Sequence, residues 1–135
     1  MERALEQLVW ERAGDRCEYC QVLQAHDRLS FEIDHIIARK HRGRTLANNL
    51  CLACFACNNH KGPNVAGVDP KTRKVVTLFN PRRHKWHVHF RWDGPVLFGL
   101  TPTGRATIAV LQINLDYRVD FRQSLIDEGV FPERV

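Results

Sequence analysis

Four cysteines in two closely spaced pairs constrain this chain more than any other feature of its sequence. Cys17 and Cys20 form one Cys-x-x-Cys pair, and Cys54 and Cys57 form another. Two such pairs are typical of a structural zinc site, in which four thiolates close a tetrahedral shell around one ion. Because thiolates are soft ligands that fill this shell, the zinc would stabilise the fold rather than act on a substrate. Cys51 has the same spacing to Cys54, so spacing alone also allows that pair.

The length of 135 residues favours a single domain over residues 1–135. A chain of this size buries about two-thirds of its unfolded surface, so metal need not be its only source of stability. No apolar run approaches the roughly 18 to 20 residues that a membrane span needs, and the charged N-terminus does not fit a secretory signal. We therefore expect a cytoplasmic protein without membrane contact, in which the cysteines bind metal rather than form disulfides.

Positive charge is concentrated in the middle of the chain. Between His35 and Arg91 there are twelve lysines and arginines and one acidic residue, Asp69, whereas the rest of the chain is net acidic. A basic segment between acidic ends favours a surface that binds a polyanion, because neutralising phosphates releases counterions. The alternative is a solvated basic face that has no partner.

The N-terminal half predicts helices and strands in an α+β order. A helix is expected over residues 2–13, ending near Gly14, because its apolar residues recur at helical spacing. Strands are expected over 31–37 and 50–53, and the basic residues between them would form a loop over 39–48. A short helix would start at Asn58 and stop at Gly62 and Pro63.

The C-terminal part, about residues 75–130, predicts an added β-hairpin followed by helices. A strand is expected over 75–79, and the period-two alternation over 85–92 predicts a second strand that turns at Asp93-Gly94 and pairs with 96–100. Thr103 would cap a helix that runs to Gln112, although residues 107–111 fit a strand equally well, and Asp116 would cap a last helix that ends before Gly129. The alternation would place Trp86, Val88, Phe90 and Trp92 on one face and Lys85, His87, His89 and Arg91 on the other.

A further set of polar residues lies around the cysteines. Asp34 and His35 end the apolar run, Asn49 precedes Leu50, and Asn58 follows Cys57 directly. In this order the motifs resemble the HNH (His-Asn-His) endonuclease family, in the variant with Asn in the final position. The likeness is to small stand-alone members with a four-cysteine zinc, and it covers about residues 17–62. It implies a zinc-stapled ββα-metal core, to which the N-terminal helix, the hairpin and the C-terminal helices are added.

The resemblance also implies a role for each residue. His35 would be the general base, Asp34 and Asn58 would hold a catalytic Mg²⁺ or Mn²⁺, and Asn49 would brace the loop that orients the base. Phosphodiester hydrolysis needs both a base and a cation, because the nucleophile and the phosphate are anionic. A histidine pKa near 6.5 suits the base, and oxygen ligands suit these hard ions. Adjacent strand residues face opposite sides, however, so Asp34 and His35 would need a twist or bulge to act at one centre.

The same resemblance selects among the cysteines. Because it places the last metal-binding Asn directly after the final cysteine, the zinc ligands would be Cys17, Cys20, Cys54 and Cys57. Cys51 would then be a small buried residue. Many relatives carry Gly-Gly in the loop, where this chain has Arg42 and Arg44 on either side of Gly43.

The function expected from these features is metal-dependent hydrolysis of DNA, and the resemblance implies products with 5′-phosphate and 3′-hydroxyl ends. Contacts to the DNA backbone, with low sequence specificity, are expected from Arg39, Lys40, Arg42, Arg44, Lys61, Arg82, Arg83, Lys85 and Arg91. The alternative is a non-catalytic zinc ribbon that binds DNA or RNA. That alternative explains the cysteines and the basic residues, but not why Asp34, His35 and Asn58 accompany them.

Overall fold

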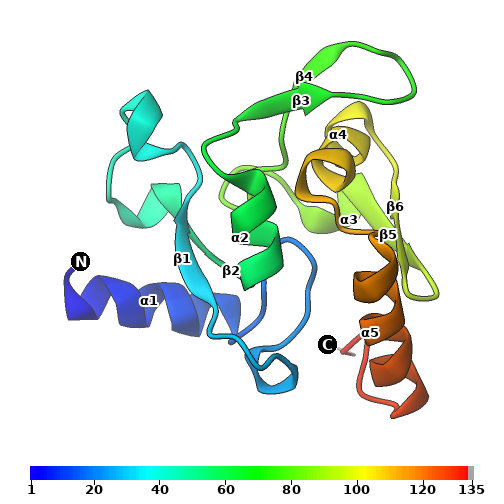
Figure 1. Ribbon diagram of the computed structural model, residues 1–135. Helices are drawn as coiled ribbons and strands as arrows, with labels where there is room; N and C mark the ends of the chain where they lie inside the picture. The colour runs from blue at the N-terminus through cyan, green and yellow to red at the C-terminus, as the bar shows by residue number, and fades with distance from the viewer. Residues whose placement is uncertain (134–135) are drawn as a thin grey trace. The chain divides into compact units, whose positions relative to one another are not determined.

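The structure is a computed structural model that describes residues 1–133, and the chain divides into two compact units (Figure 1). The N-terminal unit comprises Met1–Val65 and Asn80–His84, and the C-terminal unit comprises Ala66–Phe79 and the described residues from Lys85 onward. Helices and small antiparallel hairpins occur in both units, which confirms the predicted α+β class. That residues 1–135 act as one domain stays a prediction.

A two-stranded hairpin and a helix form the centre of the N-terminal unit. β1 (Glu32–His35) pairs antiparallel with β2 (Leu50–Ala53), and α2 (Phe55–Lys61) follows β2 after a single residue. The predicted helix therefore begins three residues earlier than expected. The reason is its cap, because the Cys54 Sγ atom accepts a hydrogen bond from the amide of Cys57. This order of elements is the expected ββα arrangement.

The first helix lies against the hairpin. α1 (Arg3–Ala13) contacts β2, and its Arg12 guanidinium donates hydrogen bonds to the carbonyls of Ala47 (2.9 Å) and Leu50 (2.7 Å). The helix ends at Gly14, whose φ of 63° lies in the left-handed region that glycine adopts without a steric penalty. The helix predicted over residues 2–13 is thus confirmed within one residue.

The loop between β1 and β2 contains two short 3₁₀ turns, η2 (Arg39–His41) and η3 (Ala47–Asn49). Arg42 takes the left-handed conformation, with a φ of 66°. Gly43 packs so closely on the chain that an added Cβ would lie 1.6 Å from the carbonyl oxygen of Ile37. One glycine therefore meets the steric demand of the loop, while Arg42 accepts the unusual backbone conformation.

The C-terminal unit contains two hairpins and three helices. β3 (Ala66–Val68) pairs with β4 (Val75–Thr77), and β5 (Phe90–Asp93) pairs with β6 (Val96–Gly99). The helices are α3 (Trp86–His89), α4 (Pro102–Leu111) and α5 (Asp116–Asp127), and α4 lies against β3, β4 and β6. The sequence did not predict β3, which is short and contains Gly67.

The predicted alternation over 85–92 is wrong in its first half. Trp86–His89 forms the helical turn α3, and only Phe90–Asp93 is strand. A helical turn brings residues four apart onto one face, and the rings of Trp86 and Phe90 lie 5.2 Å apart. Val88, which the alternation would have buried beside them, is 55% exposed. Apolar residues at 86 and 90 fit both periods, and here packing selects the helix.

The last two helices were predicted with the wrong caps. For residues 103–112 the helix is the correct alternative, but Thr101 caps it, since its hydroxyl accepts from the amide of Gly104 at 3.0 Å. Pro102 then occupies the first turn, where its missing N–H has no cost. Asp116 is the first residue of α5 rather than its side-chain cap.

A partly buried ion pair closes the β3–β4 turn onto α4. The carboxylate of Asp69 accepts two hydrogen bonds from Arg105, each of 2.9 Å, and a third from Thr72 at 2.9 Å. These bonds, the Arg105 guanidinium above all, hold the pKa of the Asp69 carboxyl well below its usual range. Within residues 1–133, the helices are too short or too polar to cross a membrane.

Candidate active site and metal centre

The four predicted cysteines meet in one buried cluster in the N-terminal unit. The Sγ atoms of Cys17, Cys20, Cys54 and Cys57 all lie within 4.8 Å of one another. The amides of Cys20 and Cys57 each donate to the sulfur of the first cysteine in their own pair, at 3.4 Å. Amide-to-sulfur bonds of this kind stabilise the negative charge on a thiolate. Cys51 lies outside the cluster, in agreement with the choice of Cys54 and Cys57.

The chemistry of this cluster suits zinc. Burial and the neighbouring thiols raise the pKa of Cys17 and Cys57 well above the ordinary value for cysteine. Four thiolates at this separation would repel one another strongly without a cation, and a divalent ion removes that repulsion. Four thiolates and no open position define a structural zinc site. This site would join the metal-binding knuckle, the tight turn Cys17–Cys20 before β1, to the start of α2.

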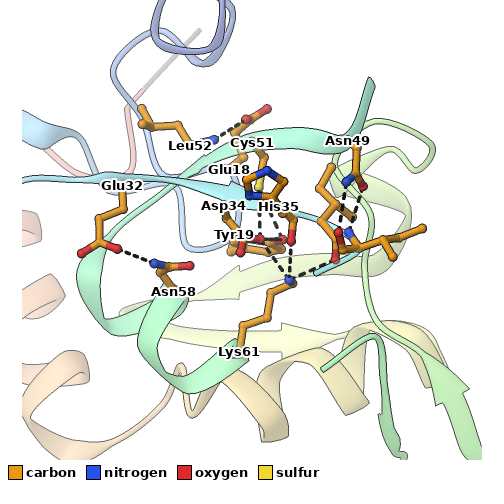
Figure 2. Close-up of polar contacts among 12 residues, drawn as sticks. Glu18, Tyr19, Glu32, Asp34, His35, Asn49, Cys51, Leu52, Asn58 and Lys61 are labelled. Carbon is orange, nitrogen blue, oxygen red and sulfur yellow. Dashed lines mark hydrogen bonds and ion pairs between the residues drawn. The ribbon is translucent and has the colours of Figure 1, made fainter. Parts of the chain in front are cut away.

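Asp34 points into the protein from the middle of β1, as Figure 2 shows. Its Oδ2 atom accepts a hydrogen bond from the hydroxyl of Tyr19 at 3.1 Å. The same oxygen forms an ion pair with the ammonium of Lys61 at 3.0 Å. The thiol of Cys51, the cross-strand neighbour of Asp34, lies 3.7 Å from the same oxygen. Burial raises the pKa of the Asp34 carboxyl, while Lys61 and the other donors oppose this shift.

The second oxygen of Asp34 has a different environment. Across residues 1–133, Oδ1 accepts no hydrogen bond, and it is not among the fully buried atoms that lack a partner. Solvent therefore reaches this oxygen, although only 6% of the residue is exposed. One oxygen of the carboxylate is held by the protein and the other is available to a ligand.

His35 follows Asp34 but interacts with different residues. Its Nε2 atom lies 2.9 Å from the hydroxyl oxygen of Thr45, and the side chain is half-buried. The pairing register runs without interruption from Glu32 to His35, so no bulge occurs among these four pairs. The structure records no side-chain bond between Asp34 and His35.

The two asparagines hold different parts of this segment. Asn49 accepts from the amide of Ile37 at 2.9 Å and donates to the carbonyls of Ile37 (3.0 Å) and Arg44 (2.8 Å). These bonds close the loop onto the end of β1, which is the bracing geometry that the resemblance implies. Asn58, on α2, donates its Nδ2 to the Glu32 carboxylate at 2.6 Å, which leaves the Asn58 Oδ1 directed elsewhere (Figure 2).

Three residues of this network were not predicted from the sequence. Tyr19 stands inside the first Cys-x-x-Cys pair, Thr45 lies in the basic loop, and Glu32 precedes Asp34 by two residues on β1. The only available signal was for Glu32, because strand residues two apart share a face. The contacts of Tyr19 and Thr45 depend on tertiary structure, which the spacing does not encode.

The basic residues predicted to contact DNA differ in their exposure. In the N-terminal unit Arg39, Lys40, Arg42, Arg44 and Arg83 are exposed. Arg82 is ion-paired with Glu18. In the C-terminal unit Lys85 and Arg91 are exposed, and the guanidinium of Arg91 lies 4.4 Å from the ring centre of Phe98.

The prediction that Lys61 contacts DNA is wrong. Only 1% of the residue is exposed, and its ammonium group is engaged within the protein. It donates to Asp34 Oδ2 at 3.0 Å and to the carbonyls of His35 (3.2 Å) and Ile36 (3.1 Å). A lysine ammonium has three N–H donors, so these three acceptors satisfy it completely.

The N-terminal unit thus contains a ββα unit with a cysteine cluster suited to zinc. Residues 17–64 match the HNH endonuclease family. The predicted resemblance over residues 17–62 is confirmed, and the family indicates a nuclease-type activity. No curated protein and no solved structure matches the chain.

Proposed function

We propose that this protein is a metal-dependent endonuclease that hydrolyses DNA phosphodiester bonds. The observation that carries the proposal is the Asp34 carboxylate, which has one oxygen fixed by three donors and one oxygen open, directly beside His35 in the HNH segment. A purely structural aspartate would gain by bonding both oxygens. An oxygen that is left open on a fixed carboxylate is suited to binding a cation.

His35 is the general base in this proposal. Its Nε2 lies 2.9 Å from the Thr45 hydroxyl. In this role Nε2 carries the proton and donates to that hydroxyl, so that Nδ1 is free to take a proton from water. The oxygen of that water attacks the phosphorus, the P–O3′ bond breaks, and the leaving 3′-oxygen takes up a proton from solvent water. The products are a 5′-phosphate and a 3′-hydroxyl. Thr45 positions the ring and selects its tautomer.

Carboxylate and amide oxygens suit a hard divalent ion. Asp34 Oδ1 and Asn58 Oδ1 would hold Mg²⁺ or Mn²⁺, which prefer oxygen ligands to the sulfur ligands of the cysteine cluster. When bound, such an ion stabilises the negative charge that develops on the phosphate. Glu32 fixes the amide of Asn58 through its Nδ2, so the oxygen of this amide is presented in one orientation.

The exposed basic loop supports DNA as the substrate. Arg39, Lys40, Arg42 and Arg44 follow the end of β1 within a few residues of His35, and all four are exposed. Charges of this kind bind phosphates without reading base sequence. Low sequence specificity and a steep loss of affinity with rising salt are the expected consequences.

Plasmid cleavage with controlled metal content tests the proposal. Protein that contains zinc but no other divalent ion is expected to leave supercoiled plasmid intact, and added Mg²⁺ or Mn²⁺ is expected to start nicking. Product ends are checked by ligation, which requires 5′-phosphate. Binding of DNA without cleavage at any metal concentration would favour the non-catalytic zinc ribbon instead.

A further inference from the structure

A buried polar network connects the cysteine cluster to Asp34. Tyr19 lies between Cys17 and Cys20, the first pair of cluster ligands, and only 1% of it is exposed. Its hydroxyl donates to Asp34 Oδ2 at 3.1 Å, and the thiol of Cys51 lies 3.5 Å from the same hydroxyl oxygen. The residue that points at the carboxylate is therefore part of the knuckle that the metal would organise.

Lys61 reaches the same carboxylate from α2. Its ammonium contacts Asp34 Oδ2 and also the main-chain carbonyls of His35 and Ile36, as Figure 2 shows. One side chain thus fixes the carboxylate of Asp34 and the backbone that carries His35. Because α2 begins at the second cysteine pair, this contact also starts from the cluster.

The direction of these bonds decides which oxygen stays open. Tyr19, Cys51 and Lys61 belong to three separate segments, and all three contact Oδ2 rather than Oδ1. A carboxylate held through one oxygen by several donors cannot rotate freely, so the other oxygen keeps one direction. Outer contacts of this kind orient metal ligands and commonly alter metal affinity by about 10- to 100-fold when they are removed.

We propose that Tyr19 and Lys61 are positioning residues that couple the cysteine cluster to the catalytic centre. Tyr19 fixes the Asp34 carboxylate from the metal-binding knuckle, and Lys61 fixes the same carboxylate and the main chain of His35 from α2. The cluster then does more than stabilise the fold, because it sets the direction of the open Asp34 oxygen. This inference rests on the proposed function, in which Asp34 holds a divalent ion.

The test removes one hydroxyl and measures the affinity for Mn²⁺. Tyr19→Phe keeps the buried ring and removes the hydroxyl, with its bond to Asp34 and its contact with the Cys51 thiol. Tyr117→Phe is the matched control, since Tyr117 is the other tyrosine of the chain and is 61% exposed. Free Mn²⁺ is followed by its EPR signal during titration of zinc-loaded protein, and the zinc content and melting temperature are measured on the same samples.

Tyr19→Phe is expected to keep its zinc and to bind Mn²⁺ about 10-fold more weakly, while Tyr117→Phe matches the wild type. Its cleavage rate at subsaturating Mn²⁺ should fall by a similar factor and recover in part as Mn²⁺ is raised. Wild-type affinity and wild-type cleavage in Tyr19→Phe would overturn the coupling and leave the proposed nuclease intact. If the wild type itself neither binds Mn²⁺ nor cleaves, the proposed function fails.

Lys61→Arg tests the same coupling if Tyr19→Phe loses its zinc or its fold. Arginine keeps the charge, but its planar guanidinium spreads its donors over three nitrogens and cannot reach all three acceptors from one atom as the ammonium does. Weaker Mn²⁺ binding by zinc-loaded Lys61→Arg supports the coupling. Unchanged Mn²⁺ affinity in this variant overturns it.

Discussion

The ammonium of Lys61 lies 3.0 Å from Oδ2 of Asp34, and both side chains are almost completely buried, at 2% and 7% exposed. Removing water from two charges is costly, and only good geometry with further hydrogen bonds offsets that cost. Here the ammonium has three acceptors, and the carboxylate oxygen has three donors. The pair therefore joins β1 to α2 at the centre of the N-terminal unit.

Breaking this pair from one side should destabilise the protein strongly. Lys61→Met leaves the buried Asp34 carboxylate without its cation, so we expect the free energy of unfolding to fall by about 3–5 kcal/mol. Lys61→Met combined with Asp34→Asn removes both charges and should recover much of this loss. Urea denaturation measures the free energy of unfolding of each variant, and Lys71→Met, at an exposed lysine, is the control. Equal effects of Lys61→Met and Lys71→Met would show that the pair contributes nothing.

Substitution of Cys51 should have a different effect from substitution of the four cluster cysteines. Purified protein is expected to contain about one zinc per chain, because four thiolates bind the ion tightly. Serine at Cys17, Cys20, Cys54 or Cys57 should lose the metal and much of the fold. Cys51→Ser should retain the zinc, because Cys51 lies outside the cluster. Metal analysis of the purified variants checks this, and loss of zinc from Cys51→Ser would contradict the ligand set.

The loop after β1 should tolerate a change at Arg42 but not at Gly43. Gly43→Ala would place a Cβ 1.6 Å from the Ile37 carbonyl oxygen, so the backbone must move, at a cost of at least about 1–3 kcal/mol. Arg42→Gly keeps the left-handed conformation without steric strain and should change stability by less than about 1 kcal/mol. Thermal unfolding of both variants gives the comparison. Equal melting temperatures would show that the loop repacks without difficulty.

The ion pair of the C-terminal unit predicts a specific pH dependence. Arg105 lowers the pKa of Asp69, so the folded state favours the ionised carboxylate more than the unfolded state does. This stabilisation is complete above the unfolded pKa of about 3.9 and is lost as pH falls from there toward the folded value. A carboxyl ¹³C NMR titration should place the Asp69 transition below the ordinary range.

Removing Arg105 tests the cause of that shift. Arg105→Gln should move the Asp69 transition back toward its ordinary pH. Arg73→Gln changes an exposed arginine of the same turn and should leave the transition in place. An Asp69 transition that stays low in Arg105→Gln would show that Thr72 and the backbone amide of Lys71, rather than Arg105, lower the pKa.

Local patterns in the sequence were sufficient for the N-terminal unit. Cysteine spacing predicted the metal site, and the resemblance carried by Asp34, His35 and Asn58 implied the ββα unit; residues 17–64 match the HNH family. These signals are reliable because ligand spacing and strand order are properties of short segments. The cap at Cys54 moved the start of α2, which only the cluster geometry could reveal.

Tertiary contacts decided what the sequence did not predict. Trp86 and Phe90 suit a strand and a helical turn equally, and the packing of their rings favours the turn. Lys61 was predicted to contact DNA together with the other basic residues. Its burial depends on three acceptors from β1 and the residue after it, which no local pattern reveals.

Cleavage by His35→Ala is the most direct test of the proposed function. This variant should keep its zinc, its fold and its DNA affinity, yet nick plasmid about 10²- to 10⁴-fold more slowly, because a positioned base is missing. Asn58→Ala should also be slow but should recover in part at high Mn²⁺, since it weakens only the binding of the ion. A His35→Ala variant that nicks plasmid in Mg²⁺ as fast as the wild type would contradict the assignment of His35 as the base.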